Sequence, residues 1–216
     1  EIAPYYEKWE DDAWMPREIW NKLGEAGLLC VDMPEEYGGF GVDFKFAALI
    51  NDIFYRRGVG AIAGGGIAVH AGIVGHYILN MGTEAQKLKY LPKMACGECV
   101  GAIGMTEPGA GSDLKALKTS AKKVDGGYVI NGSKTFISNG QHCDIVVLAC
   151  KTDPNAGAKG VSLFIVDADT KGFVKGQKLK KLGIHCQDTS ELFFDEMFVP
   201  DDALLGPLNT GFIAMM

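Results

Sequence analysis

The hydrophobic periodicity of the chain changes near Gly97, and this change limits the folds that are open to it. Before Gly97, apolar residues recur at helical spacing. After it, short segments rich in β-branched and aromatic residues alternate with turn-forming residues. Helices followed by strands are typical of an α+β protein. We therefore expect an all-α domain over residues 1–97, an all-β domain over residues 98–206, and the start of another helical region at residues 207–216.

Four helices are predicted in the first part of the chain, at residues 16–26, 44–55, 62–81 and 85–94. Asp43 is placed to cap the second helix, and Gly82-Thr83-Glu84 ends the third and caps the fourth. The third helix contains almost only small and apolar residues besides two histidines. Such a composition predicts a helix that is buried on nearly all faces.

Six short strands are predicted in the second part, at residues 100–106, 121–124, 128–131, 145–151, 161–167 and 191–194. Glycine-containing turn signals separate them, and three of these are Asp125-Gly126-Gly127, Asn131-Gly132 and Asn139-Gly140. Together these segments predict an all-β block.

Charge and hydropathy exclude two classes of partner. The 216 residues include 21 Lys and Arg against 27 Asp and Glu, and the formal net charge is −6. Because no basic block could hold a phosphate backbone, we expect no nucleic-acid partner. No apolar run reaches the roughly 18 residues that a membrane-spanning helix needs. We therefore expect no transmembrane segment.

The cysteines and histidines are the residue types that could form metal or redox sites. Six cysteines lack the density of a disulfide scaffold, which favours a reducing compartment, either a bacterial cytoplasm or a mitochondrial matrix. Cys96 and Cys99 form a CxxC pair without a second pair at metal spacing, so we interpret them as reduced thiols. His70 and His76 lie six residues apart and are interpreted as core or pocket-wall residues rather than metal ligands.

The segment Met105–Leu114, MTEPGAGSDL, is a bend that could bind a ligand. A proline removes one donor and two glycines let the chain turn and expose successive N–H groups, which suits an anion or a flat polar ring. Neither the Walker lysine nor a dinucleotide glycine pattern is present. A glycine-rich hairpin with Ser112 or Asp113 as a turn residue is the alternative interpretation.

This segment resembles the T-E-P-x-A-G-S-D signature of acyl-CoA dehydrogenases. Further similar stretches are Pro34–Gly39, Gly82–Lys87, Ile130–Gly140, Gly183–Thr189, Glu191–Asp195 and Val199–Pro200. The resemblance covers essentially the whole chain. It implies a barrel-like β domain in the middle of the protein and a C-terminal four-helix domain that is missing from this chain.

The resemblance implies an FAD site. Its expected cofactor-binding residues are Ile103, Gly104, Met105, Thr106, Glu107, Pro108, Gly109, Ala110, Gly111, Ser112, Phe136, Ile137 and Ser138. Thr106 would bond the pyrimidine edge of the flavin. Phe136 stands where a tryptophan is common in the family, and a role as a core strand residue is an equal and compatible alternative. Glu107 is expected to be structural rather than catalytic.

The same resemblance implies the substrate and the reaction. Ser112, Ala158 and Lys159 would contact acyl-CoA, although Lys159 is also interpreted as an exposed loop residue. The reaction is α,β-desaturation, and its glutamate base is expected beyond Met216, so this chain holds no catalytic residue. Small residues at positions 64–69 favour medium-to-long acyl chains, or alternatively serve close helix packing.

The expected electron acceptor is an electron-transferring flavoprotein, and the expected assembly is a homotetramer. Two alternatives stay open: an acyl-CoA oxidase that uses oxygen, or a catalytically inactive binding module with this fold. The GAGSD sequence at residues 109–113 favours the dehydrogenase over the oxidase.

Overall fold

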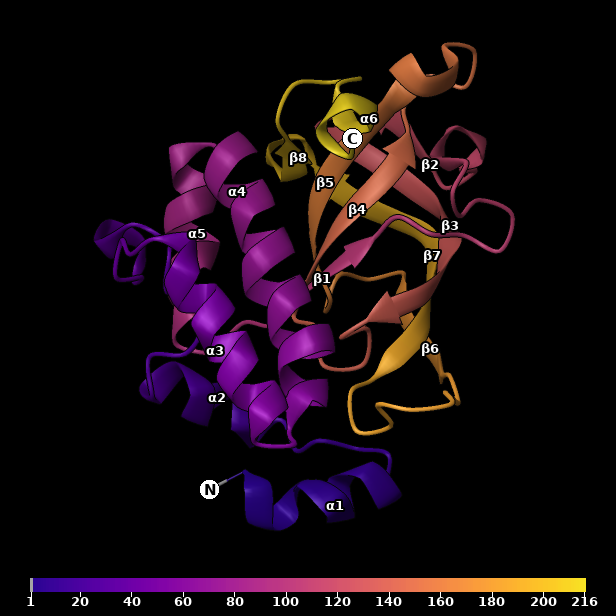
Figure 1. Cartoon of the computed structure of the whole chain (residues 1–216). Coiled ribbons are helices and arrows are strands. Elements are labelled where there is room, and N and C mark those ends of the chain that lie inside the picture. The colour runs from indigo at the N-terminus through magenta and orange to yellow at the C-terminus, as the bar shows by residue number, and fades with distance from the viewer. Residues whose placement is uncertain (1) are drawn as a thin grey trace.

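A computed structural model describes residues 2–216 of the chain, apart from the side chain of Ala63. The first residue of the predicted helical domain, Glu1, lies outside the described residues. Helices form one side of the molecule and strands the other, and the two layers meet where the helix over residues 62–81 lies beside the first strand (Figure 1). The predicted α+β architecture, with a helical part followed by a sheet, is confirmed.

The helical part consists of α1 (Ala3–Asp11), α2 (Glu18–Glu25), α3 (Phe44–Arg56), η2 (Ile62–Gly75), α4 (His76–Met81) and α5 (Glu84–Ala95). Both predicted caps are confirmed. Asp43 accepts a hydrogen bond from the N–H of Lys45, and Thr83 and Gln86 form a reciprocal capping box. Helix α1 was not predicted, and it contributes Trp9 to the core. Shorter helices are η1 (Glu35–Tyr37), η3 (Leu114–Ala116), η4 (Gly157–Gly160), η5 (Asp201–Ala203) and α6 (Gly211–Ala214).

The predicted helix over residues 62–81 is present, but its first 14 residues, η2, form a π-helix that continues into α4. A π-helix has one more residue in each hydrogen-bonded turn than an α-helix. Burial on nearly all faces was wrong, because Gly64, Gly72 and Ile73 are exposed. Small apolar residues allow close packing on one side without requiring it on the other. Within the described residues, no helix combines the length and hydropathy needed to cross a bilayer.

Within residues 2–216, eight strands form one mixed sheet. They are β1 (Gly101–Gly104), β2 (Ser120–Val124), β3 (Gly127–Ser138), β4 (Ile145–Lys151), β5 (Val161–Asp167), β6 (Phe173–Lys178), β7 (Thr189–Pro200) and β8 (Leu204–Leu205). Their order is β6-β7-β3-β2-β4-β5-β8, and β1 pairs with β4 in parallel. Strand β1 is therefore bonded to a neighbouring strand along one edge.

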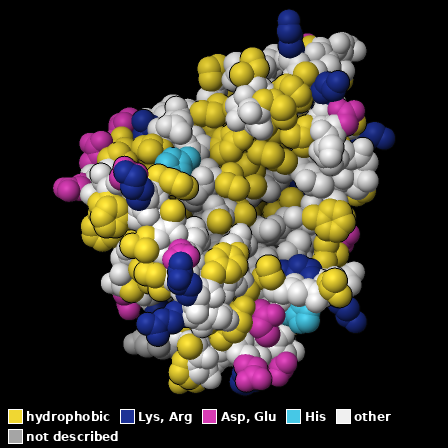
Figure 2. All heavy atoms as spheres, in the orientation of Figure 1, with side chains coloured by type: hydrophobic (Ala, Val, Ile, Leu, Met, Phe, Trp, Pro, Cys, Tyr) yellow, Lys and Arg dark blue, Asp and Glu magenta, His cyan; other side chains and the backbone are white. Residues whose placement is uncertain are grey.

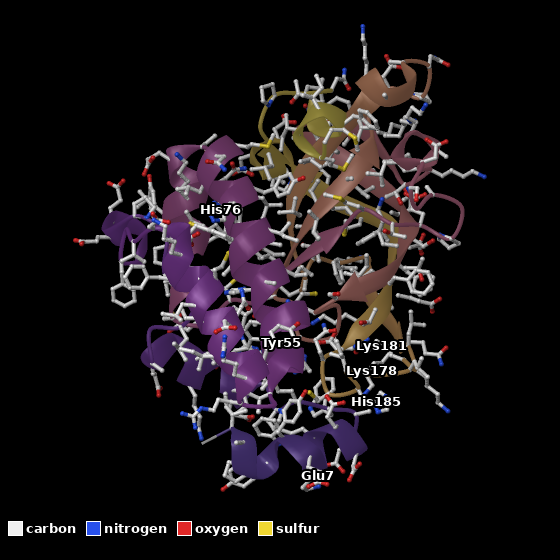
Figure 3. The ribbon with its side chains drawn as sticks, viewed as in Figure 1. Glu7, Tyr55, His76, Lys178, Lys181 and His185 are labelled. Carbon is white, nitrogen blue, oxygen red and sulfur yellow. The ribbon has the colours of Figure 1, made fainter. Side chains whose placement is uncertain are left out.

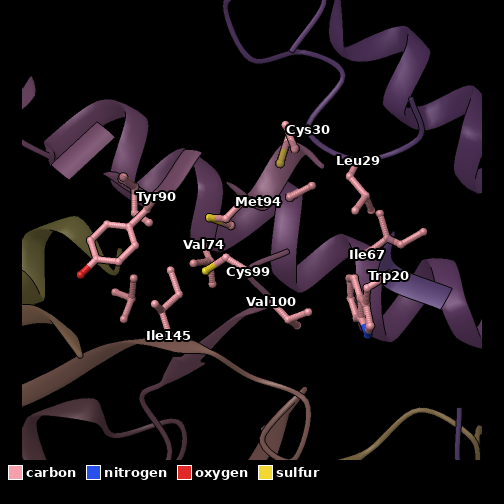
Figure 4. Packing of buried hydrophobic residues seen from close by; sticks show 14 of the residues in the cluster. Trp20, Leu29, Cys30, Ile67, Val74, Tyr90, Met94, Cys99, Val100 and Ile145 are labelled. Carbon is pink, nitrogen blue, oxygen red and sulfur yellow. The ribbon is translucent and has the colours of Figure 1, made fainter. Parts of the chain in front are cut away.

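Side-chain alternation along β4 builds two cores. Ile145 and Val147 face the helices, whereas Val146 and Leu148 face the interior that the curled sheet encloses. Figure 4 shows the first core, where Val74 of η2 and Met94 of α5 approach Ile145. The helical layer is thus fixed on one face of the sheet, next to β1.

The strands differ from the prediction in three respects. Strand β6 was not predicted, and β3 and β7 are each 12 residues long, well beyond the predicted segments. Asn131-Gly132 is not a turn but lies inside β3 at a bulge. Gly132 has φ of +149°, and a Cβ there would lie 2.6 Å from Oγ1 of Thr119. Glycine at this position therefore allows β3 to bend, rather than ending it.

His70 joins η2 to the start of β1 and to α5. Its Nδ1 accepts from the N–H of Gly101 at 3.0 Å, and its Nε2 lies 3.1 Å from the carbonyl oxygen of Met94. A carbonyl only accepts, so the proton is on Nε2 and the ring is neutral. His70 is fully buried, and this burial lowers its pKa to about 4. The prediction of a core histidine is confirmed for this residue.

The neutral His70 predicts a loss of stability in acid. Because the unfolded side chain titrates near pH 6.5, the unfolded state takes up a proton between about pH 6.5 and 4 that the folded state does not bind. The free energy of unfolding should therefore fall by about 3 kcal/mol across this window from His70 alone. Urea unfolding at several pH values checks this, and a His70→Asn variant should show a correspondingly shallower dependence. Equal pH dependence in both proteins would contradict it.

Candidate functional site

The chain leaves the sheet after β1 and forms a tight turn within the glycine-rich segment. The N–H of Glu107 donates to the carbonyl of Ala110 at 2.9 Å, and the N–H of Ala110 donates back at 3.1 Å. Gly109, Gly111 and Ser112 are exposed at this turn. The segment is therefore a bend that presents backbone and hydroxyl groups to solvent, as its glycines predict.

A buried ion pair fixes this bend onto β3. Nζ of Lys134 lies 2.8 Å from Oε1 of Glu107 and also donates to the carbonyl of Met105 at 3.1 Å. The Glu107 carboxylate further accepts from the N–H groups of Lys118 and Thr119, at 2.6 and 3.0 Å. All four contacts are internal to the protein, so this carboxylate has a structural role.

Burial and nearby charges shift the pKa values of both residues of this ion pair. Burial raises the pKa of Glu107, but the Lys134 ammonium and the N–H donors outweigh it, and the pKa lies below its ordinary value. Burial lowers the pKa of Lys134, and the carboxylate opposes this. A deprotonated Glu107 therefore anchors the bend at neutral pH.

Phe136 stands out from β3 on an unusual backbone. Its φ is +60°, it lies at a register shift between β3 and β7, and its side chain is 67% exposed. A large residue with positive φ is strained and is held by its surroundings. The neighbours Thr135 and Ile137 are buried, and the N–H of Thr135 donates to the carbonyl of Thr106 at 2.9 Å. The interpretation of Phe136 as a core residue was wrong.

The edge of β1 that faces away from β4 adjoins this bend. The N–H and carbonyl of Gly101 point away from β4, toward His70 and Asn139. Because backbone groups alternate along a strand, those of Ile103 point to the same edge. β4 is the strand that pairs with β1 in the described chain. Ile103 therefore offers one donor and one acceptor beside Met105 and Thr106.

Asn139 ties this edge to the helices. It has φ of +63° and is buried, and its Nδ2 donates to the carbonyls of Gly66 at 3.0 Å and Gly101 at 3.1 Å. Asparagine adopts this backbone conformation more readily than most residues. The end of β3, the start of η2 and the start of β1 are thereby held together.

The positions expected to contact acyl-CoA lie on adjoining loops. Nζ of Lys151 donates to the carbonyl of Lys115 at 3.1 Å and to that of Gly157 at 2.8 Å. Lys115 follows Ser112 by three residues, and Gly157 begins η4, which contains Ala158 and Lys159. Lys151 thus holds the two loops side by side, and Lys159 is exposed.

The glycines before the centre of η2 serve close packing. A Cβ on Gly64 would lie 1.9 Å from the Tyr55 hydroxyl, one on Gly65 would lie 2.9 Å from the Gln187 side chain, and one on Gly66 would touch Trp20. Figure 3 shows Tyr55 on the helical side of the face that also carries Lys181, which follows β6. The packing role proposed for these glycines therefore has direct support.

Hydrogen bonds bring part of the expected set together. Residues 103–107 contact Lys134 and Thr135, next to Phe136, and Asn139 brings η2 to the same edge. On the face seen in Figure 2, hydrophobic side chains gather between the helices and the sheet. Sequence reasoning missed the roles of Lys134 and Asn139. The lysine within the strand segment, and the Asn-Gly pair that follows it, were the available signals.

The CxxC segment contains no disulfide bond. Cys96 is exposed and Cys99 is buried, and all six cysteines, each within the described residues, are free thiols. Burial raises the pKa of Cys99 to about 12, so its thiol stays protonated at neutral pH.

Models of known families match nearly the whole chain. The acyl-CoA dehydrogenase N-terminal domain matches residues 1–98, and the acyl-CoA dehydrogenase middle domain matches residues 102–197. The chain belongs to the acyl-CoA dehydrogenase family. The resemblance inferred from its motifs is therefore confirmed.

Individual acyl-CoA dehydrogenases agree with this assignment. The mitochondrial long-chain specific enzyme of Sus scrofa is 44% identical over all of this chain and 50% of its own length. An acyl-CoA dehydrogenase structure from Geobacillus kaustophilus is 47% identical, with a TM-score of 0.95, over 99% of this chain and 56% of that one. An FAD complex from Bacillus anthracis is 36% identical, with a TM-score of 0.88, over 100% and 37%. The chain spans about half the length of the curated relatives it matches.

Proposed function

We propose that the protein binds FAD on the face formed by residues 103–112 and 136–138 and desaturates acyl-CoA thioesters between their α and β carbons. The observation that carries this proposal is Phe136, an exposed aromatic side chain on a strained backbone, next to Thr135, which bonds to the bend at Thr106. Strain of this kind is common at ligand sites. The Bacillus anthracis relative was solved with FAD.

The chemistry of the face fits a flavin ring. The pyrimidine edge of a flavin needs both donors and acceptors, and Ile103 and Thr106 supply backbone groups and a hydroxyl there. Phe136 gives a flat apolar surface for the ring, with Ile137 and Ser138 beside it. The bend from Glu107 to Ser112 completes this face. The carboxylate of Glu107 contributes by anchoring the bend rather than by contacting the ring.

The substrate is proposed to lie along the two adjoining loops. Ser112 offers an exposed hydroxyl and Ala158 a small side chain, which suits the amide-rich pantetheine arm of CoA. Lys159 is an exposed cation that can meet a CoA phosphate as a point charge. Because packing explains the glycines at 64–66, the preference for medium-to-long acyl chains rests mainly on the resemblance.

FAD held on this face would supply the acceptor for the hydride that leaves the β carbon. The residues of this chain would orient the ring and the thioester and limit the access of water. No residue of this chain is proposed as the base that removes the α proton. We propose an electron-transferring flavoprotein as the acceptor, a homotetramer as the assembly, and the bacterial cytoplasm or mitochondrial matrix as the location.

The proposed reaction is tested by flavin absorbance in the full-length protein. Anaerobic addition of acyl-CoA should bleach the visible flavin band, and air should restore it slowly. Rapid reoxidation by air with hydrogen peroxide formation would indicate an oxidase. Absence of bleaching with short, branched and long acyl-CoA would contradict catalysis and leave a binding module. The same titration across chain lengths tests the substrate preference.

Replacing Phe136 with alanine is expected to weaken FAD binding about tenfold, because an aromatic contact with the ring is lost. Stability should change by less than about 1 kcal/mol, since the side chain is 67% exposed. Isothermal titration of the apoprotein with FAD measures the first effect and urea unfolding the second. Phe198→Ala, at another exposed phenylalanine on β7, is the matched control and should leave FAD binding unchanged. Equal FAD affinity in the Phe136→Ala and Phe198→Ala variants would contradict the proposed contact between Phe136 and the flavin ring.

A further inference from the structure

Two side chains occupy the position of a missing neighbouring strand at the start of β1. The N–H of Gly101 donates to Nδ1 of His70 at 3.0 Å, and its carbonyl accepts from Nδ2 of Asn139 at 3.1 Å. Gly101 is buried, so these groups would otherwise lack partners. A Cβ on Gly101 would lie 2.7 Å from Cγ1 of Val74, which shows how closely the strand lies on η2.

The His70 ring is itself held in place on all sides. Its Nε2 donates to the carbonyl of Met94, and Sγ of Cys30 lies 4.0 Å from the same nitrogen. Trp20 packs against the ring edge-on, with centroids 5.1 Å apart. Figure 4 shows Trp20, Cys30 and Met94 in this core. These contacts leave the His70 side chain little freedom to move. Its hydrogen bond therefore holds Gly101 at a fixed position relative to η2.

We propose that His70 is a positioning residue for the flavin face, the surface formed by residues 103–112 and 136–138. Its hydrogen bond to Gly101 sets the position of Ile103, which lies on the same edge of β1. This inference rests on the proposed FAD site. Ile103 lies two residues along β1, roughly 6.6 Å from Gly101, and Met105 and Thr106 follow directly. β1 has only four residues, so a shift at its first residue reaches the flavin contacts.

Two substitutions separate the hydrogen bond from the bulk of the side chain. His70→Leu fills much of the space and removes the acceptor, whereas His70→Asn keeps an acceptor for the N–H of Gly101. In the full-length protein, His70→Leu is expected to weaken FAD binding roughly tenfold and to shift the visible flavin spectrum. His70→Asn should restore most of the affinity and the wild-type spectrum.

A matched control variant separates a specific effect on FAD binding from a general loss of stability. Ile78→Ala opens a cavity at a fully buried residue of α4, which packs against η2 and α5, and it should leave FAD affinity and spectrum unchanged. Wild-type affinity and spectrum in His70→Leu would overturn the proposal, as would the same loss in Ile78→Ala or in His70→Asn.

Amide exchange measured by NMR distinguishes this proposal from the proposed function. His70→Leu should accelerate exchange of the Gly101 N–H in the apoprotein at least tenfold relative to Ile78→Ala. If the wild-type protein binds no FAD, the proposed function fails. Unchanged protection of Gly101 in His70→Leu would overturn the positioning role whether or not FAD binds.

Discussion

Replacing Lys134 with methionine is expected to lower the free energy of unfolding by about 3–5 kcal/mol. Methionine keeps much of the apolar stem but removes the ammonium, which leaves the buried Glu107 carboxylate without its cation. The pKa of Glu107 should then rise, because burial would no longer be opposed by Lys134. Urea unfolding at neutral pH measures the loss.

Two further variants test the cause of this loss. Lys123→Met breaks the ion pair between Lys123 and Asp201, in which both side chains are more than half exposed. This variant should lower the free energy of unfolding by less than about 1 kcal/mol. A double-mutant cycle combines Lys134→Met with Glu107→Gln. The loss of stability in the double variant should be smaller than the sum of the losses in the two single variants by more than about 1 kcal/mol. Additive losses, or equal losses in Lys134→Met and Lys123→Met, would contradict the ion-pair account.

Asn139→Ala is expected to destabilise the protein by about 3 kcal/mol. The substitution leaves the carbonyls of Gly66 and Gly101 without their shared donor, at about 1 kcal/mol each, and alanine adds about 1 kcal/mol at positive φ. FAD affinity should fall as well, because Asn139 holds the edge of β1. Urea unfolding and FAD titration measure the two effects.

Asn139→Gly separates the two causes. Glycine accepts the backbone conformation but provides no donor, so it should be about 1 kcal/mol more stable than the alanine variant and still clearly less stable than the wild type. A loss below about 1 kcal/mol in Asn139→Ala would contradict the role assigned to its side chain.

Local signals in the sequence predicted the elements that depend on local chemistry. The caps at Asp43 and Thr83 satisfy N–H groups a few residues away, so the residues that make them are neighbours in the chain. The bend at Glu107–Ala110 follows from proline and glycine in the same way. Elements that depend on distant partners were missed, such as β6, which forms by pairing with residues Ser190–Phe194 of β7.

The candidate site shows the same division. Its residues were predicted by resemblance to family motifs, but the contacts that hold them were not. Lys134 and Glu107 are 27 residues apart, and their pairing depends on the position of β3 beneath the bend. The positive φ of Phe136 depends on a register shift against β7, which residue type does not indicate. Exposure of Phe136 therefore became visible only in three dimensions.

The most direct test of the central proposal is a crystal structure of the full-length protein with FAD. In that structure, the flavin ring is expected to lie against residues 103–112, with its pyrimidine edge at Ile103 and Thr106 and its ring beside Phe136. A flavin bound elsewhere, or an ordered structure with FAD present at saturating concentration and no density on this face, would contradict it.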